Sequence, residues 1–422
     1  MKNRHCRPTR SWPRRALAVA AAATMTLGLT TTATASATTT PPSIPYGMDQ
    51  LAYARMMAQI PLDAAAEKIH NAAAKPGTGH NGLVNTRVDA DHHTVTVYWH
   101  GAVPPDVARL VRRLRRTVSV TVVPARYDKE HLKAAVRRGL RMSGAVSGYP
   151  LVDGSGIQLD FAGHAAAPRA VSLNAELAVA VHTGHGGGPV TLQATCVFTG
   201  APVLGAPSRC DDQPNYWGGN VIRNATTGDG CSTAFGMHDS SGRTYMATAA
   251  HCSENLSGTP VNGITFTNGD LTHSLGQSLD VPGSHDAALI AAPAGNEYYD
   301  GPGILHGDTH NAKRVVGQQH VSVGDWLCES GAFGGVICGI QVEATNVSPA
   351  NDPWSDLVMA TTGGTYTVGG DSGGPYFSLD GSSTVWARGI HEGLGKDSSG
   401  RTVEYFTDIY TLTNDTGATV NT

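Results

Sequence analysis

Ser372 lies in a glycine-rich heptapeptide, Gly369-Gly-Asp-Ser-Gly-Gly-Pro375, towards the C-terminal end of the chain. A serine hydroxyl attacks a carbonyl carbon only where it can reach that carbon, a base takes its proton and the resulting oxyanion is stabilised. Because glycine has no Cβ atom, the backbone can turn sharply here and direct the N–H groups of Gly370 and Ser372 at one point. The heptapeptide therefore predicts a nucleophilic serine with an oxyanion hole, whereas a bare Gly-Ser-Gly is typical of an ordinary turn.

Two further residues could supply what such a serine needs. His251 follows an apolar run and precedes a cysteine, so a disulfide could fix the orientation of its imidazole. Asp286 leads a second apolar run, where a buried carboxylate would hold the imidazole in its working tautomer. The competing carboxylate, Asp280, has a less clearly apolar run after it. We therefore expect His251 to be the base and Asp286 to orient it.

The elements that must position these residues change in character along the chain. Apolar spacing and proline positions predict an α/β unit over residues 49–143, with helices at 49–75, 104–116 and 128–141 and strands at 94–99 and 118–123. From Gly144 helical periodicity disappears, and Gly-rich short strands are expected at 156–161, 178–182 and 190–197. After Asn215, short strands and turns follow at the spacing typical of β-barrels. The catalytic candidates thus lie in an all-β part.

The N-terminal residues predict an exported protein. Residues 1–37 combine basic residues, an apolar run and small residues, which predicts a signal peptide with the export route left open. No later run is long and charge-free enough for a membrane anchor.

The two parts of the chain differ in net charge. Residues 38–215 carry 17 basic and 13 acidic residues, a net charge of +4, whereas the residues after Asn215 carry 7 basic and 21 acidic residues, a net charge of −14. The two parts should attract each other, and nothing indicates nucleic-acid binding.

Six cysteines remain after Cys6 leaves with the signal peptide. In an oxidising compartment an even number predicts disulfides, and six cysteines permit 15 connectivities. Pairing neighbours closes the smallest loops and gives Cys196–Cys210, Cys231–Cys252 and Cys328–Cys338. Zinc binding is the alternative, but no pair has the close Cys-x-x-Cys spacing of zinc ligands.

Three segments carry a resemblance to known enzymes. Thr248-Ala-Ala-His-Cys252 and Gly370-Asp-Ser-Gly-Gly-Pro375 resemble the signatures of the chymotrypsin-like (trypsin-like) serine peptidases. Cys328-Glu-Ser-Gly-Ala-Phe-Gly-Gly-Val-Ile-Cys338 is similar to a disulfide hairpin of the bacterial α-lytic protease and streptogrisin branch. The resemblance implies two six-stranded antiparallel β-barrels with His251, Asp286 and Ser372 in the cleft between them. No metal or cofactor is expected.

The same resemblance implies a precursor. Residues 94–141 look like that branch's pro-region, which templates folding and is then removed. We expect a pro-region over residues 38–213, an α/β part at 49–143 and a β-rich part at 144–213, followed by the peptidase domain at 214–422. The boundary is uncertain by about twenty residues. Val368 departs from the pattern, because many relatives have a cysteine there.

The specificity pocket gives two conflicting indications. Gly389-Ile-His391-Glu-Gly393 resembles the pocket wall of the glutamyl endopeptidases, in which a histidine and a threonine or serine contact the substrate carboxylate, and Thr367 matches the second position. Glu404 aligns approximately with the base of the pocket, where a carboxylate would attract Arg or Lys. Two matches outweigh one, so the expected preference is for acidic residues, with the residue preference left open.

The sequence thus predicts a secreted serine endopeptidase that acts as a monomer on protein or peptide substrates, with its own pro-region as a partner. A catalytically silent secreted binding protein on the same fold is the alternative, and loss of a triad member would favour it. A lipase or esterase is a third possibility, but there the histidine follows the serine.

Overall fold

A computed structural model describes residues 44–75, 81–162, 170–185, 188–192, 208–281, 283–350, 352–381 and 383–422. The predicted signal peptide, residues 1–37, lies outside these ranges. The described residues all fall within one compact unit, Ile44–Thr422. No helix in the described ranges is long and apolar enough to cross a membrane.

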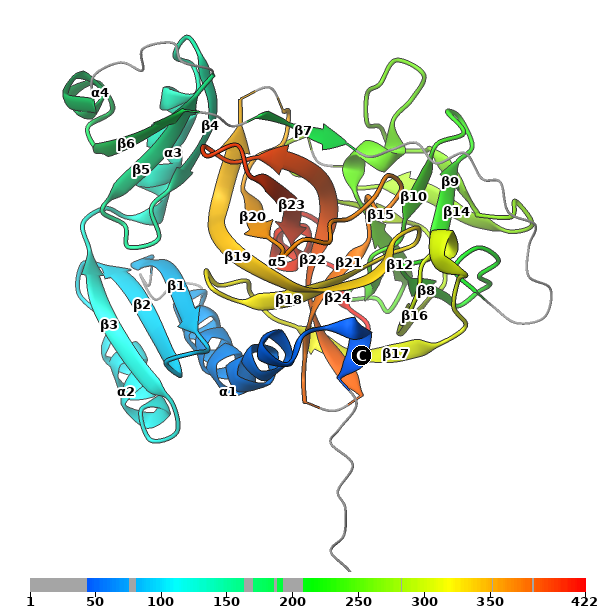
Figure 1. Cartoon of the computed structure of the whole chain (residues 1–422), viewed down its shortest axis with the longest axis horizontal. Coiled ribbons are helices and arrows are strands. Elements are labelled where there is room, and N and C mark those ends of the chain that lie inside the picture. The colour runs from blue at the N-terminus through cyan, green and yellow to red at the C-terminus, as the bar shows by residue number, and fades with distance from the viewer. Residues whose placement is uncertain are drawn as a thin grey trace, which may run out of the picture. The chain divides into compact units, whose positions relative to one another are not determined.

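The N-terminal part consists of two units with the same order of elements (Figure 1). Each has a helix, two antiparallel strands, a crossover helix and a third strand that runs parallel to the second. The first unit contains α1 (Gln50–Ala73), β1 (Leu83–Asp89), β2 (Thr94–His100), α2 (Pro105–Leu114) and β3 (Ser119–Ala125). The second contains α3 (Lys129–Gly139), β4 (Ala145–Pro150), β5 (Gly156–Phe161), α4 (Ala170–Leu177) and β6 (Ala180–His185).

Capping side chains and a proline fix the positions at which these helices begin. The Asp49 carboxylate accepts a hydrogen bond from the Ala52 N–H at 2.8 Å and caps α1. Asp128 caps α3 in the same way, by accepting from the His131 N–H at 2.8 Å. Pro105 occupies the first position of α2, where its missing N–H costs nothing. Each unit buries its own apolar cluster between helices and sheet.

The expectation that helices end before residue 144 is wrong, because α4 lies within the supposedly β-rich stretch. This helix has only eight residues, so its apolar periodicity is too short to stand out in the sequence. Its Leu173 and Leu177, four residues apart, are both buried in the apolar cluster of the second unit. Tertiary packing therefore stabilises a helix that the sequence pattern does not reveal.

The C-terminal part begins with a curled antiparallel sheet in the order β10-β9-β13-β14-β15-β12-β11-β24. The two short strands β10 and β11 belong to one bent segment, Gly230–His238, and pair with β9 and β12 respectively. Strand β10 is at one end of this sheet, and β11 is next to the strand at the other end. The sheet therefore curls so that both of these regions meet at the segment that contains β10 and β11. Its strands are β9 (Val221–Asn224), β10 (Gly230–Ser232), β11 (Gly236–His238), β12 (Thr244–Thr248), β13 (Thr265–Asn268), β14 (Ser274–Leu279), β15 (Ala288–Ile290) and β24 (Thr419–Val420).

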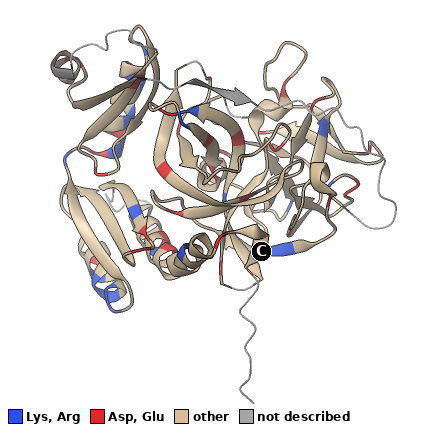
Figure 2. Cartoon of the chain, in the orientation of Figure 1, with Lys and Arg blue, Asp and Glu red and all other residues tan. Residues whose placement is uncertain are grey.

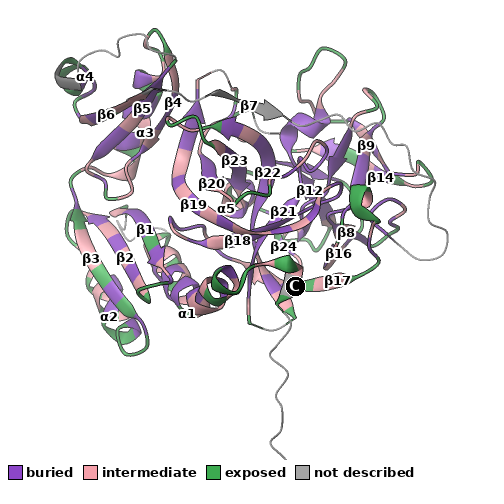
Figure 3. Cartoon of the chain, viewed as in Figure 1, coloured by how far each residue is buried: buried purple, intermediate pink, exposed green. Residues whose placement is uncertain are grey.

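Six further strands form a closed antiparallel ring, since each pairs with the next in the order β22-β21-β18-β19-β20-β23 and β23 pairs again with β22. They are β18 (Trp326–Gly331), β19 (Gly335–Pro349), β20 (Leu357–Thr361), β21 (Pro375–Leu379), β22 (Thr384–Lys396) and β23 (Thr402–Asp408). Figure 3 shows that these strands are largely buried. Flanking elements are β7 (Gly188–Leu192), β8 (Tyr216–Gly218), β16 (Ala294–Tyr299), β17 (Ala312–Gln318) and α5 (Ile409–Thr416).

The predicted fold class, a chymotrypsin-like all-β part preceded by an α/β part, is confirmed. The second barrel closes as expected, whereas the first is a curled sheet with a shared bent segment at its ends. Strand β1, which the sequence analysis did not predict, completes the first small sheet.

Contacts across the chain tie the α/β part to the second barrel. Strand β4 adds to β19 through Gly148 and Ser348, and the Val88 N–H donates to the Val323 carbonyl at 2.8 Å. Figure 2 shows Lys and Arg along α2, but the five arginines of residues 109–116 are exposed. The α2 helix packs against α1 and β3 of its own unit.

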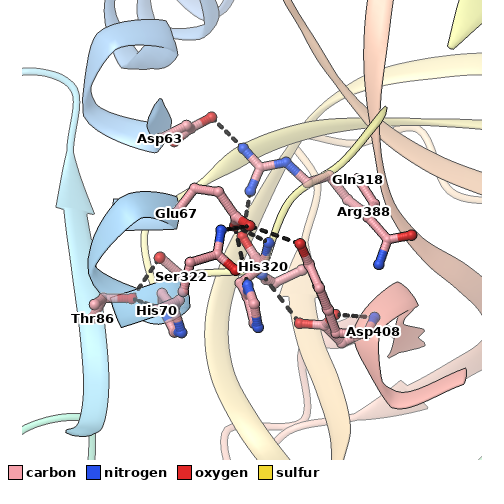
Figure 4. Close-up of polar contacts among 12 residues, drawn as sticks. Asp63, Glu67, His70, Thr86, Gln318, His320, Ser322, Arg388 and Asp408 are labelled. Atoms are coloured by element: carbon pink, nitrogen blue, oxygen red, sulfur yellow. Dashed lines mark hydrogen bonds and ion pairs between the residues drawn. The ribbon is translucent and has the colours of Figure 1, made fainter. Parts of the chain in front are cut away.

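The polar contacts between α1 and the β-rich part have the opposite polarity to the net charges of the two parts. The acidic residues lie on α1 of the basic N-terminal part, and their basic partners lie in the acidic C-terminal part (Figure 4). Asp63 pairs with Arg388, a buried residue of β22. Glu67 accepts from the N–H of His320 at 2.8 Å, from its Nδ1 at 3.0 Å and from the Tyr410 hydroxyl at 2.7 Å. Specific ion pairs and hydrogen bonds thus join α1 to the β-rich part.

Candidate active site

His251 and Asp286 lie together because their strands are neighbours. His251 follows β12 in a short 3-10 helix, Ala250–Ser253, and Asp286 precedes β15, which pairs with β12. The His251 N–H donates to one carboxylate oxygen of Asp286 at 2.8 Å, and its Nδ1 lies 2.7 Å from the other. Both residues are buried. This contact fixes the imidazole and leaves Nε2 facing away from the carboxylate.

The charge of His251 depends on this pair. Burial lowers the pKa of the imidazole, but the charge and hydrogen bond of Asp286 outweigh it, so the pKa lies above its ordinary value. Nε2 is buried and has no hydrogen-bond partner among the described residues. A base with its second nitrogen available is what proton transfer from a serine requires.

Ser372 lies in the loop before β21, buried at 0% exposure. Its hydroxyl donates to the carbonyl oxygen of Glu392 at 3.2 Å, and no described hydrogen bond joins it to His251. The Ser232 N–H, from β10, donates to the Ser372 carbonyl at 2.7 Å and so ties the serine loop to the first sheet. The serine has to rotate away from Glu392 before it can give its proton to His251.

The backbone around Ser372 has the form that an oxyanion hole needs. Gly370 has a φ of +97°, and a Cβ atom there would lie 2.3 Å from the Phe333 ring. The N–H groups of Asp371, Gly373 and Gly374 donate to backbone carbonyls. No described acceptor takes a hydrogen bond from the N–H of Gly370 or Ser372, so both remain available for a ligand oxygen.

Asp371 is a residue whose role the sequence analysis missed. Its carboxylate accepts from the N–H groups of Phe333 at 3.0 Å, Gly334 at 2.9 Å and Val368 at 2.8 Å. Burial raises the pKa of Asp371 to about 6 despite these bonds. It fixes the loop that carries Gly370, and the signal for this role was an acid in the glycine-rich heptapeptide directly before Ser372.

The three candidate pocket residues also lie together. Glu404 accepts from the Thr367 N–H at 3.1 Å and from the Tyr376 hydroxyl at 2.6 Å. The same hydroxyl lies 3.4 Å from Nδ1 of His391. Glu404 therefore sits behind His391, connected through Tyr376. Tyr376, four residues after Ser372, was not predicted as a site residue.

These groups have shifted proton affinities because they are buried. Burial raises the pKa of Glu404 to about 7, and burial with the nearby His251 lowers the pKa of His391 to about 3. The His391 Nε2 and the Thr367 Oγ1 are buried and have no partner among the described residues. Buried polar atoms are nearly always paired, so these two atoms are candidates for contact with a ligand.

An extended segment of the N-terminal part lies beside this site. Strand β7 pairs antiparallel with β22, with Leu192 opposite Gly393 and Thr191 opposite Leu394. Gly393 directly follows Glu392, whose carbonyl holds the Ser372 hydroxyl. The edge of β22 next to the serine therefore already accepts an added strand.

Two of the three expected disulfides are present, Cys231–Cys252 and Cys328–Cys338. The first bridges β10 to the residue after His251 and so anchors the base. Cys210 has a free, buried thiol, and Cys196, its expected partner, lies outside the described residues. Cys210 belongs to a segment packed into the first sheet, where its carbonyl accepts from the Asp270 N–H at 3.1 Å.

The chain matches no protein-family model and no curated protein sequence. Among solved structures it is similar to a Nocardiopsis protease, with a TM-score of 0.36 and 20% identity, and to a Cellulomonas bogoriensis chymotrypsin, with 0.36 and 21%. A glutamic acid-specific serine protease matches with a TM-score of 0.37 and 23% identity. Each match covers 49% of this chain and 98% to 100% of the other.

Proposed function

We propose that this chain is a secreted serine endopeptidase, made as a precursor whose N-terminal part covers the site. The observation that carries the proposal is the His251–Asp286 pair, buried beside a serine whose loop presents two available N–H groups. In the proposed reaction His251 takes the proton of Ser372, whose oxygen attacks the peptide carbonyl. The N–H groups of Gly370 and Ser372 hold the oxyanion, and the peptide C–N bond then breaks as the leaving amine takes the proton from His251. Water, which gives a proton to His251, attacks the acyl group, and the carboxylic acid product leaves as Ser372 regains its proton.

The precursor state is supported by what lies on the site. Strand β7 occupies the edge of β22 that an extended substrate would use, in the manner of β-strand addition. The hydroxyl of Ser372 is turned to Glu392, and both Ser372 and His251 are buried. Removal of the N-terminal part would free this edge. Two disulfides agree with an extracellular location.

The test compares the secreted wild-type chain with Ser372→Ala. The wild type should hydrolyse casein and react covalently with a fluorophosphonate, and Ser372→Ala should do neither while remaining folded by circular dichroism. Ser257→Ala, an exposed serine elsewhere in the β-rich part, is the matched control and should keep both activities. A wild-type protein that is secreted and processed but reacts with no fluorophosphonate would instead support the silent binding protein.

A further inference from the structure

Arg209 is a fully buried arginine in the segment that precedes β8. It has 0% exposure, and the residues around it, Ser208, Cys210 and Asp212, are also buried. The Arg209 carbonyl accepts from the Val221 N–H of β9 at 2.7 Å. This segment therefore packs as part of the β-rich core, although the sequence analysis assigned it to the pro-region.

The guanidinium is held by oxygen atoms from three elements. Nη1 donates to the Gly219 carbonyl at 2.8 Å, and Nη2 donates to the Ser330 hydroxyl at 2.8 Å. Nε donates to the Pro302 carbonyl, and Nη2 donates to the carbonyls of Tyr299 and Gly301, all at 3.1 Å. A guanidinium has five N–H donors, so the surroundings use nearly all of them.

Arg209 makes no direct ion pair among the described residues, unlike the other fully buried arginine, Arg388. Burying a charge is costly unless something compensates it. The acids close enough to affect its pKa are Glu329, Asp308 and Asp371, which raise it, whereas burial lowers it. Arg209 is thus a buried positive charge, and two of these acids, Glu329 and Asp371, are buried as well.

Short contacts lead from Arg209 to the oxyanion hole. Ser330, which Arg209 contacts, is followed by Gly331, where a Cβ atom would lie only 2.1 Å from the Asp371 carboxyl carbon. The next N–H, of Ala332, donates to the Ser232 hydroxyl at 2.9 Å. That hydroxyl donates to the Gly370 carbonyl at 2.8 Å. The loop that Arg209 holds therefore lies directly against Asp371 and reaches Gly370 through the Ser232 hydroxyl.

We propose that Arg209 is a positioning residue that holds the loop next to the oxyanion hole. The proposal rests on the proposed function, and Arg209 touches no reacting atom. It has a second consequence: the catalytic domain includes Arg209 and does not start at residue 214. Processing must then cut on the N-terminal side of Arg209, since a later cut would remove an integral buried residue.

The effect on pH dependence follows from the groups around Asp371. Glu329 of β18, Glu404 of β23 and Tyr376 of β21 all interact with it, and Arg209 is the cation that lowers its pKa. The loop needs the ionised carboxylate, because it accepts three N–H bonds. Loss of the positive charge therefore raises the pKa of Asp371, and activity is lost at a higher pH on acidification.

The experiment uses the full chain, secreted and processed, with Arg209→Met and Arg209→Lys. We expect Arg209→Met to lower kcat about a hundredfold with little change in KM, as expected for loss of oxyanion stabilisation. The acid limb of its kcat profile should move to higher pH and become steeper. Arg209→Lys should return the acid limb of the kcat profile to its wild-type pH but restore only part of kcat. Lysine keeps the positive charge but lacks the planar set of N–H donors of the guanidinium group. Arg243→Met, an exposed arginine, is the control and should match the wild type.

The second measurement does not depend on the variants folding. Mass spectrometry of the mature wild-type enzyme should give an N-terminus at or before Arg209, and a start at Cys210 or later overturns the proposal. An Arg209→Met enzyme with the wild-type kcat and acid limb also overturns it. In either case a wild type that still reacts with fluorophosphonate leaves the proposed function standing.

Discussion

The two parts of the molecule differ most in what they bury. The two α/β units bury apolar clusters between helices and small sheets, from residues close together in sequence. The α/β units also bury the carboxylates of Asp63 and Asp160, at 5% and 2% exposure. The β-rich part buries more of them, among them Asp286, Glu329, Asp371, Glu392 and Glu404, each with an exposure of 0%. Buried carboxylates cost free energy, so their concentration there agrees with the place of the proposed active site.

The parts also differ in how far apart their contacts lie along the chain. The three strands of the first small sheet fall within residues 83–125, whereas β24, at the C-terminus, pairs with β11. Chains dominated by distant contacts fold slowly, because loop closure precedes the stabilising contacts. The α/β part can thus fold first and present β4 and α1 to the barrel.

The largest expected effect comes from separating the β-rich part from the α/β part. Residues 208–422 alone, diluted from denaturant, should recover activity orders of magnitude more slowly than the full chain, because no preformed surface guides the pairing of β19. Adding residues 44–192 in trans should restore recovery, as measured by casein hydrolysis over time. Rapid, complete refolding of residues 208–422 without that addition would contradict the templating role.

The second expected effect concerns specificity. His391→Ala should lower kcat/KM for substrates with an acidic residue before the cleaved bond by about a hundredfold, because a buried carboxylate would lose its donor. Glu404→Gln should have a smaller effect, since Glu404 acts through Tyr376. Cleavage of a mixed peptide library measures both. Cleavage after Arg or Lys that is lost in Glu404→Gln and kept in His391→Ala would reverse this assignment.

The same pocket should respond to pH. Below about pH 7 Glu404 is protonated and can donate to Tyr376, whose hydroxyl then donates to Nδ1 of His391. That order leaves the proton of a neutral His391 on Nε2, facing the pocket. Cleavage after acidic residues should therefore weaken as pH rises through about 7, relative to cleavage after apolar residues. In Glu404→Gln this relative change should disappear.

How much of this could be read from the sequence depends on whether the signal is local. The triad candidates lie in short motifs, and the His251–Asp286 pair forms as expected. The role of Arg209 could not be predicted, because its partners are carbonyls of residues 219, 299, 301 and 302. Likewise Tyr376 connects His391 to Glu404 only once β21, β22 and β23 are paired.

A third expected effect tests the contact of α1 with the barrel. Arg388→Met leaves Asp63 and Asp325 buried without their cation, which should lower the free energy of unfolding by about 3–5 kcal/mol. Arg55→Met breaks a more exposed pair with Asp91 and should cost at most about 1 kcal/mol. Urea unfolding of both in a Ser372→Ala background gives the comparison. Equal costs would mean that the Asp63–Arg388 pair contributes no more than a surface pair.

The smallest expected effect is the pH dependence of that same contact. Burial raises the pKa of Glu67, but the hydrogen bonds and charge of His320 and the hydroxyl of Tyr410 outweigh it and lower the pKa to about 2 from 4.5. A lowered carboxyl pKa stabilises the folded chain above pH 4.5, and this contribution is lost as pH falls towards 2.

The shift corresponds to at most about 3 kcal/mol, at roughly 1.4 kcal/mol for each pKa unit. Unfolding of the Ser372→Ala chain between pH 5 and pH 2 should show this loss, and Glu67→Gln should flatten that part of the curve. Glu130→Gln changes an exposed carboxylate of the same α/β part and should leave the curve unchanged. If Glu67→Gln follows the parent curve throughout, Glu67 is not an acid-sensitive link between α1 and the barrel.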